Sequence, residues 1–201
     1  MRTVTTRFIF GAQLFLTAAS FAQSLDENAL VAALQEGGYI LVMRHASSPR
    51  QAPTAAEANH DNRNRERQLD ATGRSDALAM GASIRRLGIS ITEILSSPAY
   101  RTLETALLAG FEEVQVRDYL GNQGMLNSSQ AFADQLLDNL KNPPPLGNRL
   151  LITHSPNIAR ALPALSLEVE QGEVLVIDPE QSVAEPIARI PINQWSRLRL
   201  P

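Results

Sequence analysis

The sequence predicts a single α/β domain in which strands alternate with helices around a mostly parallel sheet. Short apolar runs such as 39–43 and 149–153 fit buried strands, and amphipathic stretches such as 129–141 fit helices. Strands that are separated by helices usually lie parallel, with the helices covering both faces of the sheet. The 201 residues, 44% of them apolar and 19% charged, are enough for one domain with a core.

The expected helices are recognised from residues that favour helix starts. Ser24 and Thr72 fit the N-caps of the first two helices, and Ser97 followed by Pro98 fits the start of the third. The helices are expected at 24–36, 72–87, 97–109 and 129–141, with a short last helix that opens at 155–156. The strands are expected at 39–43, 93–95, 114–116, 149–153, 173–177 and 187–190.

The N-terminus has the pattern of an export signal. Arg2 and Arg7 precede a mostly apolar run, and Ser20-Phe21-Ala22 places small residues at both positions that a signal peptidase reads. The run is too short to span a bilayer, so we expect no stable membrane anchor. The alternative is a buried N-terminal helix. We therefore predict a signal peptide over residues 1–22, one domain over 23–201, and a periplasmic or secreted protein.

Charge and cysteine content exclude several classes of function. Loss of residues 1–22 would remove two arginines and no acidic residue, which changes the net charge from −3 to −5. An acidic surface argues against nucleic acid as a partner. The chain has no cysteine, which excludes disulfides, thiolate metal sites and a cysteine nucleophile.

Three expected strands end in residues that suit phosphoryl transfer. The first is followed by Arg44-His45, the second by Ser97 and Arg101, and the fourth by His154. The carboxyl ends of parallel strands meet at one edge of a sheet, which is where such folds bind ligands. A neutral imidazole is a competent nucleophile near pH 7, and guanidinium groups bind phosphate oxygens in pairs. If the arginines and imidazoles do this work, the chemistry needs no metal.

These segments resemble the motifs of the histidine phosphatase superfamily, the phosphoglycerate-mutase-like proteins. The segment Val42-Met43-Arg44-His45-Ala46 resembles that family's strand-end Arg-His-Gly motif, and 68–74 resembles its leucine-to-glycine helix start. The segment 95–106 resembles its second arginine block, and 151–158 its second histidine block. The four motifs occur in the family's order within residues 37–178.

The resemblance implies a three-layer α/β/α fold with a six-stranded mixed sheet. It implies that His45 is the nucleophile and forms a phosphohistidine, and that Arg44, Arg101 and His154 form the phosphate pocket. It implies no metal and no organic cofactor.

The chain departs from the family pattern at two positions. Ala46 replaces the usual glycine of the first motif, and the amide Asn122 stands near the position where many members carry a glutamate general acid. We therefore predict Asp118 as the general acid, with Glu57 and Asp61 as the next candidates.

The long polar segment 46–69, which we call the nucleophile loop, is expected to select the substrate. It follows the predicted nucleophile and carries Arg50, His60, Arg63, Arg65 and Arg67. We predict that Arg63 and Arg65 bind a phosphorylated small molecule with further charge, such as a sugar phosphate of the cell envelope. The alternative is a solvated loop whose arginines are balanced by its own acidic residues.

The leading hypothesis is a metal-independent phosphomonoester hydrolase, a phosphatase that acts through a phosphohistidine. The alternatives are a phosphoglycerate-type mutase, a protein phosphohistidine phosphatase, and a catalytically weak phosphate-binding protein. The sequence does not fix the natural substrate or the oligomeric state.

Overall fold

The computed structural model describes residues 26–121, 129–163, 169–181, 183 and 185–201. The predicted signal peptide, Ser24 and Asn122 lie outside these residues. Within them, no helix is long and apolar enough to cross a membrane. The elements, in chain order, are α1 (Glu27–Glu36), β1 (Ile40–Arg44), α2 (Ala71–Arg86), β2 (Ile91–Ser96), α3 (Tyr100–Leu108), β3 (Val114–Val116), η1 (Asp118–Leu120), α4 (Ser129–Lys141), β4 (Asn148–Thr153), α5 (Ser155–Ala161), β5 (Val174–Ile177), β6 (Ala188–Ile190) and η2 (Ile192–Arg197).

The six strands form one mixed sheet in the order β3-β2-β4-β1-β5-β6. Strands β1, β4, β2 and β3 are parallel, whereas β5 runs antiparallel to β1 and β6 antiparallel to β5. The expectation of a three-layer fold with a mixed six-stranded sheet is confirmed. Because β5 runs the other way, its first residues lie at the edge where β1 ends.

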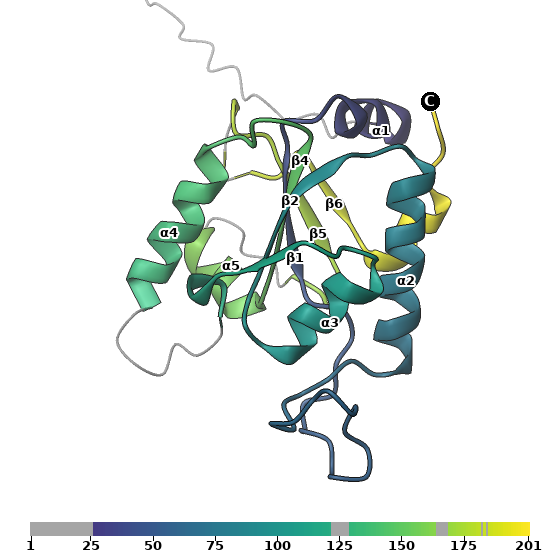
Figure 1. Ribbon diagram of the computed structural model, residues 1–201. Helices are drawn as coiled ribbons and strands as arrows, with labels where there is room; N and C mark the ends of the chain where they lie inside the picture. Colours follow the sequence, from purple (N-terminus) through teal and green to yellow (C-terminus); the bar gives the residue numbers. More distant parts are fainter. Residues whose placement is uncertain (1–25, 122–128, 164–168, 182, 184) are drawn as a thin grey trace, which may run out of the picture.

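Helices cover both faces of the sheet, with α4 and α5 on one side and α1, α2 and α3 on the other (Figure 1). Successive residues of β1 enter different cores: Leu41 and Met43 pack under α1 and α2, whereas Ile40 and Val42 pack under α4 and α5. A strand buried on both faces reads as a continuous apolar run, which explains why β1 was recognisable from sequence.

Aspartates cap the first two helices, in place of the residues predicted from the sequence. Helix α1 begins after Asp26, whose Oδ1 accepts a hydrogen bond from Ala29 N at 2.8 Å, so Ser24 is not its cap. Helix α2 is capped by Asp70, whose Oδ1 accepts from Gly73 N at 2.8 Å, and not by Thr72. In both helices the capping carboxylate satisfies a backbone N–H of the first turn.

The predicted cap of the third helix is also wrong. Helix α3 begins at Tyr100 after Ala99, without a side-chain cap, so Ser97 and Pro98 lie before the helix. The hydroxyl of Ser97 accepts a hydrogen bond of 3.2 Å from Ala99 N just before the helix, and its second partner belongs to the candidate site.

Candidate active site

The three central parallel strands bring the predicted histidines and arginines to one edge of the sheet. Arg44 at the end of β1 pairs in register with Thr153 at the end of β4, so His45 and His154 follow neighbouring strand ends. Their ring centroids lie 5.4 Å apart, with an interplanar angle of 62°. Both side chains are buried, at 3% and 2% exposure. The two imidazoles are therefore close enough for both to contact the same small ligand.

The His45 ring is fixed in one tautomer. Its Nδ1 lies 2.8 Å from the carbonyl oxygen of Ala46, and a carbonyl can only accept a hydrogen bond, so Nδ1 carries the proton. The lone pair is therefore on Nε2. Burial lowers the pKa of His45 to about 3; the hydrogen bond to Ala46 opposes this, and the charges of Arg101, Arg44 and Arg67 add to it. His45 is a neutral imidazole at neutral pH, as a nucleophile must be.

Thr105 of α3 supports the same segment. Its hydroxyl donates to Arg101 O at 2.7 Å and accepts from Ala46 N at 3.2 Å. The backbone that orients the His45 ring is thereby tied to the helix that carries Arg101. The alanine in place of the family's glycine keeps the carbonyl that holds Nδ1.

His154 is held at both ring nitrogens. Nη2 of Arg101 lies 2.9 Å from Nδ1 and can only donate, so Nδ1 accepts and Nε2 carries the proton. Nε2 lies 2.9 Å from the hydroxyl oxygen of Ser97, which is the partner that the sequence did not predict. Burial lowers the pKa of His154 to about 2, and the nearby Arg101 is the next largest cause. His154 is therefore also neutral at neutral pH.

Three arginines surround the two imidazoles. Arg101 is buried, and its Nε has no hydrogen-bond partner in the described part of the chain. Burial lowers the pKa of Arg101 to about 10, and the charge of Arg67 lowers it further. Arg44 donates from Nη1 to Val169 O at 2.7 Å. A buried guanidinium N–H without a partner, beside further positive charge, is the arrangement expected around a bound oxyanion.

Arg67 is the arginine of the nucleophile loop that approaches the site. Its guanidinium donates to Pro49 O at 2.5 Å and to Ser48 O at 3.1 Å, and its charge lowers the pKa of both histidines. Arg63 and Arg65, which were predicted from the sequence to bind the substrate, are exposed and are not among the charges that act on the two histidines. The apolar Leu69, two residues after Arg67, could have indicated that this end of the loop is fixed to the core, since its side chain is buried.

The acidic residues of the loop are tied to the fold. Glu57 accepts hydrogen bonds from the backbone N and the hydroxyl of Thr54, which lower the pKa of Glu57. A lowered pKa is the opposite of what a general acid needs. Asp61 accepts a hydrogen bond of 2.6 Å from the Tyr100 hydroxyl.

Asp118, the first candidate for the general acid, is exposed on η1 just after β3. The segment that follows it is held to the site: Thr153 Oγ1 donates to Leu120 O at 2.7 Å, and Asn157 Nδ2 donates to Gly121 O at 2.8 Å. The role of Asp118 stays a prediction. Within the described chain, no three His, Asp or Glu side chains converge in a way that would hold a metal.

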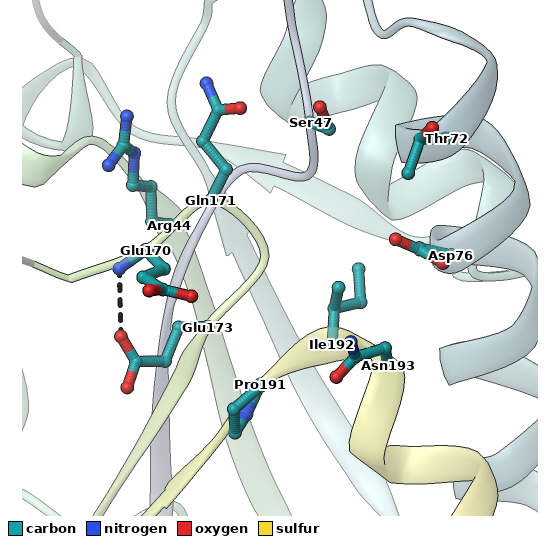
Figure 2. A pocket seen from close by; sticks show the side chains of 10 residues that line it. All are labelled: Arg44, Ser47, Thr72, Asp76, Glu170, Gln171, Glu173, Pro191, Ile192 and Asn193. Atoms are coloured by element: carbon teal, nitrogen blue, oxygen red, sulfur yellow. Dashed lines mark hydrogen bonds between the residues drawn. The ribbon is translucent and has the colours of Figure 1, made fainter.

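A polar hollow of about 540 Å³ lies beside the end of β1. Ser47 and Arg44 line it together with residues from the start of α2, the start of β5 and η2. Figure 2 shows the carboxylates of Asp76 and Glu170 directed into the hollow from opposite sides. The third carboxylate, Glu173, is paired with Arg189 at 2.6 Å. The hollow therefore offers hydrogen-bonding groups next to the nucleophile segment.

Comparisons with known proteins identify the fold. No protein-family model and no curated protein sequence matches the chain. Among solved structures, the protein histidine phosphatase SixA, solved with tungstate, superposes with a TM-score of 0.54 at 15% identity, covering 78% of this chain and 98% of SixA. The structure of an Agrobacterium tumefaciens protein named as the phosphohistidine phosphatase SixA superposes with a TM-score of 0.53 at 18% identity. The match covers 76% of this chain and 97% of that protein.

A third structure, that of a Thermus thermophilus protein, has a TM-score of 0.50 at 17% identity and covers 76% of this chain and 98% of its own. At these identities the likeness concerns the fold alone. This chain has the fold of the histidine phosphatase, phosphoglycerate-mutase-like superfamily.

Proposed function

We propose that the protein is a phosphatase that transfers the phosphoryl group of a phosphomonoester to Nε2 of His45 and then to water. The observation that carries this proposal is the hydrogen bond from His45 Nδ1 to the Ala46 carbonyl, which leaves the Nε2 lone pair available in a site rich in guanidinium groups. Nucleophilic catalysis requires an unprotonated ring nitrogen, and the burial of His45 provides one.

In the first step the Nε2 lone pair forms the N–P bond while the P–O bond to the leaving group breaks. Arg44, Arg67 and Arg101 neutralise the charge on the three equatorial oxygens, which is the largest contribution that a protein makes to such a reaction. The ring becomes positively charged as the bond forms, and its Nδ1–H remains bonded to Ala46 O. In the second step water attacks phosphorus, the N–P bond breaks and neutral His45 is restored.

The leaving group needs a proton, and the described carboxylates differ in how well they would supply it. Glu57 is disfavoured by its lowered pKa and Asp61 by its bond to Tyr100, so Asp118 remains the leading candidate. If no carboxylate acts, the enzyme is restricted to good leaving groups. That restriction favours a second candidate function, hydrolysis of phosphohistidine on a protein, because an imidazole leaves more readily than an alkoxide.

The polar hollow and the loop arginines support a hydrophilic, charged substrate. Carboxylates and hydroxyls beside the nucleophile segment suit the hydroxyl groups of a sugar, and Arg63 and Arg65 would face further negative charge. Together with the predicted export signal, this supports a phosphorylated sugar of the cell envelope.

Turnover of an aryl phosphate by the purified protein tests the chemistry. We expect hydrolysis that is unaffected by a metal chelator and that falls by about a thousandfold or more in His45→Ala. His60→Ala is the matched control, because His60 is exposed in the loop and should be dispensable. Binding of phosphate without any hydrolysis would favour a phosphate-binding protein over an enzyme.

A further inference from the structure

Two hydrogen bonds, which we call the bracket, connect the nucleophile loop to α3. They lie on either side of Arg67 in the loop and of Arg101 in the helix. Glu66 Oε2, on one side of Arg67, accepts from the backbone N of Tyr100 at 3.1 Å. Leu69 N, on the other side, donates to Glu104 Oε2 at 2.7 Å. Tyr100 and Glu104 flank Arg101 in the same way. The bracket therefore fixes the position of the loop segment 66–69 relative to the first turn of α3.

Glu104 is the centre of this connection. Its other oxygen, Oε1, accepts from Asn59 Nδ2 and from Arg74 Nε, both at 2.9 Å, and the residue is only 8% exposed. Hydrogen bonds to a buried carboxylate are stronger than neutral ones, and the full set of partners offsets the cost of burying its charge. Arg74 Nη2 also donates to Asn59 Oδ1 at 3.1 Å, which closes the network.

The bracket opposes a repulsion. The charge of Arg67 lowers the pKa of Arg101, whereas the charge of Glu66 raises it. Pro49 O and Ser48 O hold the Arg67 guanidinium itself, and the bracket holds the backbone on either side of it, so that the two cations stay close despite their repulsion. We propose that Glu104 is a positioning residue, which fixes Arg67 of the loop against Arg101 of α3 as a preformed oxyanion-binding pair. This proposal rests on the proposed phosphatase function and gives a role to a residue of the second arginine block for which the resemblance implied none.

Preformed charge matters because it costs no reorganisation when the phosphate arrives. If the loop closed only when substrate binds, part of the binding energy would be needed to bring the two guanidinium groups together. The nucleophile loop therefore acts at this end as a fixed wall of the site. Its exposed tip, with Arg63 and Arg65, can vary with the substrate.

The test is a double-mutant cycle on the binding of inorganic phosphate. Glu104→Gln preserves the size of the side chain but sets an amide NH₂ against one of the donors. We expect it to weaken the Kd for phosphate about tenfold, a change of about 1.4 kcal/mol. Arg67→Ala should cost a similar factor in the wild-type background and less than about threefold in the Glu104→Gln background. Additive effects, or an unchanged Kd in Glu104→Gln, would overturn the proposal.

The control is Glu93→Gln, which removes a comparable carboxylate–guanidinium contact with Arg149 at 2.6 Å, outside the bracket. It should leave the Kd for phosphate unchanged, whatever it does to the melting temperature. If Glu104→Gln does not fold, Glu66→Ala replaces it in the cycle, because it removes the oxygen that accepts from Tyr100 N, and the same coupling to Arg67 is expected.

Different results would refute the proposed role of the bracket and the proposed phosphatase function. A wild-type protein that binds phosphate but forms no phosphohistidine would refute the proposed function and leave the bracket intact. An active wild type with an additive cycle would refute the bracket alone. A wild type that does not bind phosphate at all refutes the bracket as an oxyanion-binding device.

Discussion

Lowering the pH from 7 to 5 should destabilise this fold through its two buried imidazoles. In the folded protein the pKa of His45 is lowered to about 3 and that of His154 to about 2. In the unfolded chain each imidazole titrates near its usual pKa of about 6.5. Below that value the unfolded chain takes up protons that the folded protein cannot accept. The stability that the neutral imidazoles contribute is therefore complete above about pH 6.5 and is lost as the pH falls.

The size of the effect follows from linkage. Between pH 7 and pH 5, one histidine that stays neutral in the fold costs about 2 kcal/mol, and the pair costs about 4 kcal/mol. The figure depends on the unfolded pKa and hardly on the folded one, because both folded values lie well below 5. Carboxylates titrate mostly below about pH 5 in an unfolded chain, so this pH range isolates the imidazoles.

Urea unfolding at pH 7 and pH 5 measures this difference. The wild type should lose about 4 kcal/mol of unfolding free energy, which is a large part of the stability of an ordinary domain. A variant that carries both His45→Gln and His154→Gln should lose much less, because glutamine does not titrate. An equal loss in the two proteins would refute the conclusion that the histidines are held neutral.

Three further substitutions test separate parts of the structure. Ser97→Ala removes the partner of His154 Nε2 and should lower kcat for an aryl phosphate about fivefold, the equivalent of one lost hydrogen bond of roughly 1 kcal/mol, as measured by steady-state kinetics. Gly81→Ala places a Cβ 1.9 Å from the carbonyl oxygen of Ala109, where α2 meets α3, and should cost about 2 kcal/mol of unfolding free energy in urea. Arg63→Ala should raise KM for a charged sugar phosphate more than it changes kcat for a small aryl phosphate.

Each of these substitutions has an outcome that would contradict its reasoning. Ser96→Ala is the control for Ser97, because its hydroxyl is equally buried but donates to Ser97 O and not to a histidine. Equal activity of the two serine variants would exclude a role for the Ser97 hydroxyl in holding His154. An unfolding free energy of Gly81→Ala within about 0.5 kcal/mol of the wild type would mean that α2 and α3 can separate easily. Equal effects of Arg63→Ala on both substrates would count against a substrate-selecting loop.

The fold was largely predictable because its strands are buried on both faces and its helices are amphipathic. The run at β1 and the amphipathic pattern of α4 needed no tertiary information. The helix caps were less predictable. Thr72 and Asp70 both suit an N-cap position, and the choice depends on which side chain reaches the free backbone N–H groups. The helix η2, with the buried Trp195 packed into the core under α2, has no sequence signal of comparable strength.

The site was predictable where its residues follow directly from a strand end or, like Arg101, stand in a motif just after one. His45 and His154 follow neighbouring parallel strands, so the topology that brings them together could be inferred from the alternation of elements. A serine before proline usually caps a helix, and the Ser97 hydroxyl does accept from Ala99 N, but nothing local predicts its second bond to a histidine 57 residues away in the chain. Arg67 could not be told from Arg63 and Arg65, because the course of an irregular loop is decided by distant contacts such as the one between Leu69 and Glu104.

Identification of the phosphorylated atom tests the central claim most directly. The purified protein is mixed with an aryl phosphate, quenched in alkali during turnover, and examined by phosphorus NMR and by peptide mass spectrometry. Because Nδ1 of His45 is held by the Ala46 carbonyl, we predict a base-stable, acid-labile phosphoramidate on Nε2 of His45, absent in His45→Ala. Phosphate on Nδ1 or on another residue, or steady turnover with no phosphohistidine during the reaction, would contradict the account.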